Sequence, residues 1–119
     1  SLESLLRDPI GRLLFREFLE SEFSEENLEF WLAVEEFKKA EDEEERRSKA
    51  KEIYDKYLSP NAPKEVNLDS DLREEIEENL KNEEPPPDLF DEAQEEVYEL
   101  LEKDSYPRFL ESDYYLRFL

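Results

Sequence analysis

A single glycine, Gly11, occurs in this chain of 119 residues, whereas prolines number seven. So few glycines disfavour a turn-rich β-sheet. Apolar residues instead recur three and four positions apart, for example at Ala50, Ile53, Tyr54, Tyr57 and Leu58. This is the period of an amphipathic α-helix, so the sequence predicts an all-α fold.

The same period predicts where the helices lie. We expect short helices over residues 1–7 and from Pro9 to about Phe23, and then longer helices over residues 24–40, 46–58, 69–81 and 88–103. Two apolar stripes on the helix over 24–40 indicate burial on two sides, so this helix should be central. The four long helices suggest an antiparallel four-helix bundle.

The last sixteen residues are expected to be helical as well. Asp104 is a candidate N-cap for a short helix in which Pro107 occupies the first turn, where proline is tolerated. A final segment carrying Tyr114, Tyr115, Phe118 and Leu119 should pack back on the body. The short helices at both ends of the chain are expected to form a second layer.

Composition excludes several classes of protein. The formal net charge of −20 argues against attraction to nucleic-acid phosphates or to an anionic membrane surface. Many acidic runs on such a surface provide solubility alone. The chain has no cysteine, no long apolar run and no signal peptide, so we expect a soluble cytoplasmic domain that meets membranes only through a partner or flanking segments. Abundant Lys and Glu without Cys, Met or His are typical of a consensus or designed sequence.

Residues for catalysis are scarce. Without histidine there is no Ser-His-Asp relay, no imidazole ligand and no di-iron site of the Glu-x-x-His type. One glycine cannot build the usual phosphate-cradling loop. The segment 69–71 begins like a calcium loop, but the glycine and the spaced ligands that should follow are missing. A binding or scaffolding domain without cofactor or metal is therefore favoured over an enzyme.

Three polar segments carry the functional prediction. Ser24, Glu26 and Asn27 open the helix over 24–40, and a similar cluster lies far along the chain at residues 102–110. The third segment covers residues 64–69. Helix starts at a protein surface are suited to presenting such polar groups to a partner.

With these segments in view, the chain resembles the regulator of G-protein signalling (RGS) domain family. The matching runs occur in family order and are Ser4–Leu6, Phe15–Leu19, Ser24–Leu32, Lys49–Tyr54, Lys64–Asp69, Phe90–Gln94 and Asp104–Leu110. The resemblance implies one domain over residues 1–119 with about nine helices. It also implies a bundle subdomain over about 24–103 and a terminal subdomain made of about 1–23 and 104–119.

The resemblance also implies a function. Such domains bind the α subunit of heterotrimeric G proteins (Gα) and accelerate its GTP hydrolysis, which terminates signalling. The domain supplies no catalytic residue, because Gα carries its own arginine in cis. It holds the switch segments of Gα in their transition-state arrangement, and we expect it to act as a monomer.

The family motif assigns partner contacts to three segments, which should meet on one face. The first contains Phe23, Ser24, Glu26 and Asn27, the second Lys64, Glu65 and Asn67, and the third Leu100, Asp104, Ser105 and Arg108. Asn27 would lie near the Gα glutamine that orients the attacking water, since an amide both donates and accepts. Asp104 would accept hydrogen bonds from Gα, and Arg108 would brace the surface.

Structural roles compete with these assignments. Ser24 and Asp104 are also candidate N-caps, Asn27 could be local polar filler, and Arg108 could pair with acidic neighbours inside the domain. The large aromatic residues Phe30, Trp31, Phe37 and Tyr106 are expected in the core. For the whole chain, two other functions remain open: a designed helical scaffold with the family fold but no activity, and an acidic docking module for a basic protein.

Overall fold

The computed structural model describes residues 1–82 and 84–118, and every regular element within them is a helix, as predicted. The α-helices are α1 (Leu2–Arg7), α2 (Pro9–Ser21), α3 (Glu26–Lys38), α4 (Glu43–Ile53), α5 (Ser70–Leu80), α6 (Asp91–Leu100), α7 (Tyr106–Leu110) and α8 (Asp113–Phe118). Two π-helical segments, η1 (Tyr54–Leu58) and η2 (Leu101–Ser105), continue α4 and α6.

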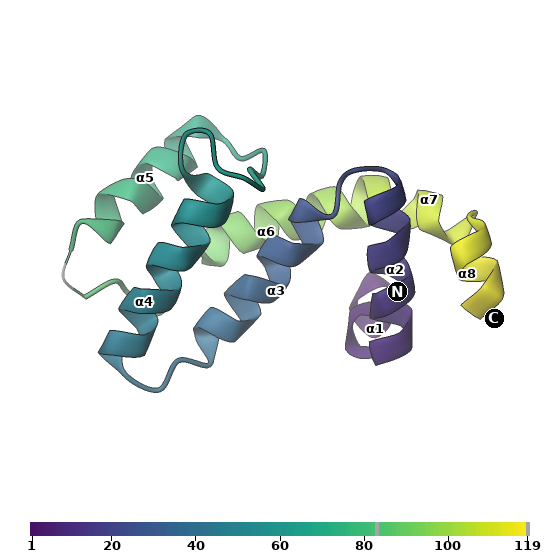
Figure 1. Cartoon of the computed structure of the whole chain (residues 1–119), viewed down its shortest axis with the longest axis horizontal. Coiled ribbons are helices and arrows are strands. Elements are labelled where there is room, and N and C mark those ends of the chain that lie inside the picture. Colours follow the sequence, from purple (N-terminus) through teal and green to yellow (C-terminus); the bar gives the residue numbers. More distant parts are fainter. Residues whose placement is uncertain (83, 119) are drawn as a thin grey trace.

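The helices form two groups along the long axis of the molecule. Helices α3, α4, α5 and α6 gather at one end, and α1, α2, α7 and α8 lie at the other (Figure 1). Helix α3 packs against both α4 and α6, and α2 packs against both α1 and α8. The helical path from α6 through η2 into α7 connects the two groups, so the predicted boundary at residues 103/104 falls inside η2.

Aromatic rings fill the core of each group. In the first group, Phe30 and Phe37 meet Phe90 edge to face, with ring centroids 6.4 and 5.0 Å from it. In the second, Phe15 and Phe18 surround Phe109 at 5.1 and 5.7 Å. These residues are buried, and burying each ring contributes about 1.5–3 kcal/mol. The core predictions for Phe30 and Phe37 are confirmed, whereas Trp31 and Tyr106 are only partly buried.

A buried polar side chain links α3 to α6. Gln94 is 5% exposed, and its Nε2 donates to the Trp31 carbonyl at 3.1 Å and to Glu35 Oε2 at 2.8 Å. Burial alone would raise the pKa of Glu35, but hydrogen bonds from Gln94 and Lys38 outweigh it and lower that pKa. The bond to Trp31 therefore fixes the middle of α3 against α6.

Several helix ends differ from the predicted ones. Helix α4 begins at Glu43 rather than residue 46, because Asp42 caps it by accepting from the Glu45 N–H at 2.8 Å. Helix α6 begins at Asp91 rather than residue 88, because a turn closed by the Asp91 N–H and the Asp88 carbonyl precedes it. Asp69 caps α5 by accepting from the Asp71 N–H at 2.8 Å.

The capping predictions for Ser24 and Asp104 are wrong. Glu25 occupies the N-cap of α3 in a helical conformation and makes no side-chain cap, while the Ser24 hydroxyl donates backward to the Leu19 carbonyl. Asp104 lies inside η2, where no helix begins, and its carboxylate accepts from Arg108. In both cases another group captures the side chain that was expected to cap.

The C-terminal segment packs back on the body as predicted. Tyr114 meets Phe18 and Tyr115 meets Phe109, with ring centroids 6.0 and 5.5 Å apart. The predicted contact of Leu119 lies outside the described residues. Across the described part of the chain, no helix combines the length and the apolar character needed to cross a membrane.

Candidate partner-binding site

The first segment of the site is the turn between α2 and α3. Phe23 has a left-handed backbone (φ 58°), and its N–H donates to the Glu20 carbonyl at 3.1 Å. The Ser24 N–H donates to the Leu19 carbonyl at 3.0 Å, so these two bonds close the last turn of α2. The Phe23 side chain is 90% exposed. A large aromatic residue is thus displayed to solvent on a backbone that residues with a side chain adopt only at a cost of about 1–2 kcal/mol.

Asn27 follows in the first turn of α3. It is partly buried, and its amide has no hydrogen-bond partner in the part of the chain that the structure describes. Glu26, beside it, lies in the same first turn, where a negative charge suits the helix dipole. The amide of Asn27 therefore keeps its donors and its acceptor available.

The second segment is the loop between η1 and α5. Its backbone is held by the N–H groups of Lys64 and Val66, which donate to the carbonyls of Lys56 and Tyr57 at 3.0 Å each. Arg73 of α5 donates to the Leu58 carbonyl and, at 2.7 Å, to the Val66 carbonyl. These bonds fix the loop that carries Lys64, Glu65 and Asn67.

An ion pair ties the second segment to the first. Lys64 Nζ lies 2.8 Å from Glu25 Oε1, across 39 residues of sequence. The hydrogen bond lowers the pKa of the Glu25 carboxyl and raises the pKa of Lys64. Glu25 Oε2 is buried without a partner among the described residues, so the carboxylate depends on Lys64 for its compensation.

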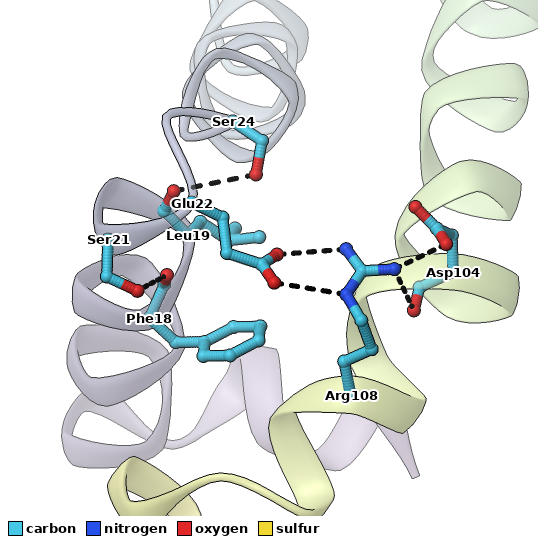
Figure 2. Close-up of polar contacts among 7 residues, drawn as sticks. All are labelled: Phe18, Leu19, Ser21, Glu22, Ser24, Asp104 and Arg108. Carbon is cyan, nitrogen blue, oxygen red and sulfur yellow. Dashed lines mark hydrogen bonds and ion pairs between the residues drawn. The ribbon is translucent and has the colours of Figure 1, made fainter.

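The third segment runs from the end of α6 through η2 into α7. The Arg108 guanidinium faces Glu22 on one side, at 2.9 and 3.1 Å, and Asp104 on the other (Figure 2). Glu22 is the C-cap residue of α2, so Arg108 joins α7 to the turn that displays Phe23. These carboxylates raise the pKa of Arg108 further above its ordinary range. The interpretation of Arg108 as an intradomain partner of acidic residues is confirmed.

The second and third segments also meet. Asn67, Leu100 and Asp104 line one hollow of about 470 Å³. Leu100 is 42% exposed, whereas Ser105 is 4% exposed and has little surface to offer a partner. The Asn67 amide, like that of Asn27, has no partner among the residues that the structure describes.

The three predicted segments are therefore joined in pairs, by Glu25–Lys64, by Glu22–Arg108 and by the shared hollow. Sequence reasoning missed Glu22, Glu25 and Arg73, which hold the segments in place. The partners of Glu25 and Glu22 are 39 and 86 residues away, so no local pattern marks them. In 1–82 and 84–118, no group of three or more candidate metal ligands lies together.

The chain is similar in sequence to known proteins over nearly its whole length. The family model for "Regulator of G protein signaling domain" matches residues 1–118. Regulator of G-protein signaling 1 of Xenopus tropicalis is 50% identical over 117 residues, which are 98% of this chain and 57% of that protein. Regulator of G-protein signaling 5 of Sus scrofa is 48% identical over 119 residues, 100% of this chain and 65% of that protein. Regulator of G-protein signaling 1 of Homo sapiens is 50% identical over 119 residues, 100% of this chain and 56% of that protein. The chain thus spans somewhat more than half the length of these relatives.

Proposed function

This chain belongs to the regulator of G protein signaling domain family, and on that premise we propose that it binds the switch regions of a Gα subunit and accelerates GTP hydrolysis by that subunit. It acts as a GTPase activator and performs no chemistry of its own. The work of the domain is differential binding, since only a contact that is tighter in the transition state than in the ground state speeds the reaction.

The observation that carries the proposal is the joining of three distant segments into one polar surface without a reactive group. Two ion pairs hold the segments, and the amides of Asn27 and Asn67 are left without partners among the described residues. Such a surface is suited to hold a mobile partner loop in one conformation. Pre-ordered contacts of this kind lower the entropic cost of ordering that loop.

We assign each segment a role in this binding. Asn27 approaches the Gα glutamine that orients the attacking water, with Phe23, Ser24 and Glu26 beside it. Lys64, Glu65 and Asn67 form a second contact, and Leu100 and Asp104 a third. Arg108 braces the third contact through Glu22, and buried Ser105 supports it from below. The domain acts as a monomer in the cytoplasm and needs no cofactor.

The proposal is tested by binding to Gα in two nucleotide states. Gα loaded with GDP and aluminium fluoride mimics the transferring phosphoryl group, and GDP alone is the reference. We expect binding to the mimic to be tighter by about tenfold or more, which is about 1.4 kcal/mol. Equal affinity for both states would rule the mechanism out.

The Asn27→Ala variant tests the assigned contact. Because the amide makes no bond within the described structure, its removal should leave the thermal midpoint nearly unchanged. We expect it to reduce the acceleration of single-turnover GTP hydrolysis by about ten- to a hundredfold. A variant that loses stability instead would show that Asn27 has a structural role.

The net charge of −20 favours a second candidate, an acidic docking module for a basic protein. That function predicts binding that collapses with added salt and ignores the nucleotide bound to Gα. A well-folded domain that neither binds Gα nor accelerates its GTP hydrolysis would instead be a scaffold that keeps the fold without the activity.

A further inference from the structure

A second hollow, of about 580 Å³, lies where α1 and α2 meet α3 and α6. It shares no residue with the proposed Gα surface. Its size falls in the range of small-molecule sites, about 300–1,000 Å³. Nothing about it depends on the proposed GTPase-activating function.

Two aromatic side chains supply an apolar wall. Trp31 of α3 and Tyr98 of α6 line the hollow, with ring centroids 6.2 Å apart, and Leu6 of α1 adds an aliphatic surface. Both rings are partly buried, so each still presents a face or an edge. A flat ring system could stack on such a wall.

Arg12 of α2 supplies a cation to the same hollow. It is partly buried, and one of its nitrogens donates to the Leu6 carbonyl at 3.0 Å. It has no carboxylate partner among the described residues, in a chain with 36 acidic and 16 basic side chains. A guanidinium carries five N–H donors, so most of its hydrogen-bonding capacity remains unused.

The carboxylates that line the hollow already have partners, and two of these partners, Arg7 and Lys39, line it as well. Glu3 pairs with Arg7 at 2.6 Å, and Glu36 pairs with Lys39 at 3.2 Å. Glu35 accepts from Gln94 at 2.8 Å and pairs with Lys38 at 3.1 Å. Within 1–82 and 84–118, Arg12 is therefore the one charged residue lining the hollow that has no oppositely charged side chain as a partner. A partly buried charge without a counter-ion is costly, and an incoming oxyanion would offset that cost.

We propose that this hollow binds a small aromatic oxyanion, a carboxylate or a phosphate ester. The oxygens of the ligand form bidentate hydrogen bonds with the Arg12 guanidinium, and the ring of the ligand lies against Trp31 and Tyr98. The simpler role for Arg12 is to cap the C-terminal end of α1 through the Leu6 carbonyl alone. The two roles differ in whether an anion binds.

Trp31 is the only tryptophan of the chain, so its indole N–H gives a single nuclear magnetic resonance signal that reports on the hollow. The probes are 2-naphthoate, 2-naphthyl phosphate and the neutral 2-naphthamide. We expect a saturable shift of the indole signal with either anion, and affinity at least about tenfold weaker with the amide. Whether the carboxylate or the phosphate binds more tightly identifies the head group.

Arg12→Gln should weaken binding of both anions by about tenfold or more, down to the level of the amide. The matched control is Arg117→Gln on α8, an exposed arginine outside the hollow, which should bind as the parent does. If Arg12→Gln fails to fold, Arg12→Lys decides, because it keeps the charge but loses the bidentate pairing and should bind with intermediate affinity. Equal affinities for acid and amide, or no saturable shift up to about 10 mM probe, would leave Arg12 as a helix cap and overturn the site.

Discussion

Phe23 combines an exposed aromatic ring with a left-handed backbone, and the two properties should separate on mutation. Glycine adopts φ 58° without strain and is the preferred residue just after a helix. We therefore expect Phe23→Gly to raise the free energy of unfolding by about 0.5–1 kcal/mol, measured by urea denaturation. The same variant should weaken binding to Gα in its transition-state form, because the displayed ring is gone.

Phe23→Ala is the matched control for this prediction. Alanine also lacks the ring but keeps the Cβ that makes the left-handed region unfavourable, so it should lose binding without gaining stability. A loss of stability in Phe23→Gly would mean that the ring stabilises the fold by packing on the domain, despite its exposure.

The ion pair between Glu25 and Lys64 should make stability depend on pH. The folded-state pKa of Glu25 lies below its ordinary value of 4.5, so the pair contributes stability above pH 4.5. This contribution is lost as the pH falls through the lowered pKa. We expect Glu25→Gln to lower the urea midpoint at pH 7 and to converge on the parent as the pH falls through that lowered pKa. Glu17→Gln, an exposed change on α2 without an ion pair in the described structure, should show no such convergence, and a difference that persists in acid would exclude the electrostatic explanation.

At the scale of elements, the π-helical segment η1 and the loop after it depend on one side chain. Arg73 bonds to the carbonyls of Leu58 and Val66, and these bonds hold the loop that carries Asn67. We expect Arg73→Met to lower the free energy of unfolding by about 2 kcal/mol, because two charge-assisted hydrogen bonds are lost and two carbonyls lose a donor.

Hydrogen exchange locates the effect of Arg73→Met. The amides of Lys64 and Val66 should exchange faster, and Gα binding should weaken although Arg73 lies outside the proposed contacts. Arg117→Met on α8 removes an exposed arginine and should change neither the exchange of these amides nor Gα binding. If binding is unchanged while the two amides exchange faster, the order of this loop does not matter for the partner.

The helices could be predicted from sequence because their signal is local. The spacing of Ala50, Ile53, Tyr57 and Leu58 marks a helical face, and these residues are buried. Helix ends were less predictable, because they depend on which of several nearby groups captures a side chain, as the Leu19 carbonyl does for Ser24. The five-residue π-helical segments leave no mark in the apolar spacing, so the predicted helix over 88–103 did not show that η2 bridges α6 and α7.

For the site, the sequence predicted the three segments but not the residues that join them. Its three segments followed from a resemblance to a family, and the structure shows contacts that join them. The residues that hold them, Glu22 and Glu25, could not be selected, because 36 acidic residues offer too many equivalent partners for Lys64 and Arg108. Only the folded backbone decides which carboxylate lies within reach.

At the scale of the whole molecule, the charge of −20 is spread over a body of 47 × 29 × 21 Å. The observed ion pairs leave this net charge unchanged, and most join exposed neighbours close in sequence, such as Arg7–Glu3 and Lys51–Asp55, so each contributes little stability. At about 10 mM salt the screening length of about 30 Å lets like charges repel across most of the molecule, whereas at about 150 mM it falls to about 8 Å. Self-repulsion of this kind destabilises the compact state.

Added salt should therefore stabilise this domain. We expect the thermal midpoint to rise by a few degrees between about 10 and 150 mM NaCl, with KCl giving the same increase at equal ionic strength. Long-range attraction between this acidic domain and any basic partner surface should move the other way, because the same screening weakens it. A midpoint that falls with salt would show that the surface ion pairs outweigh the repulsion.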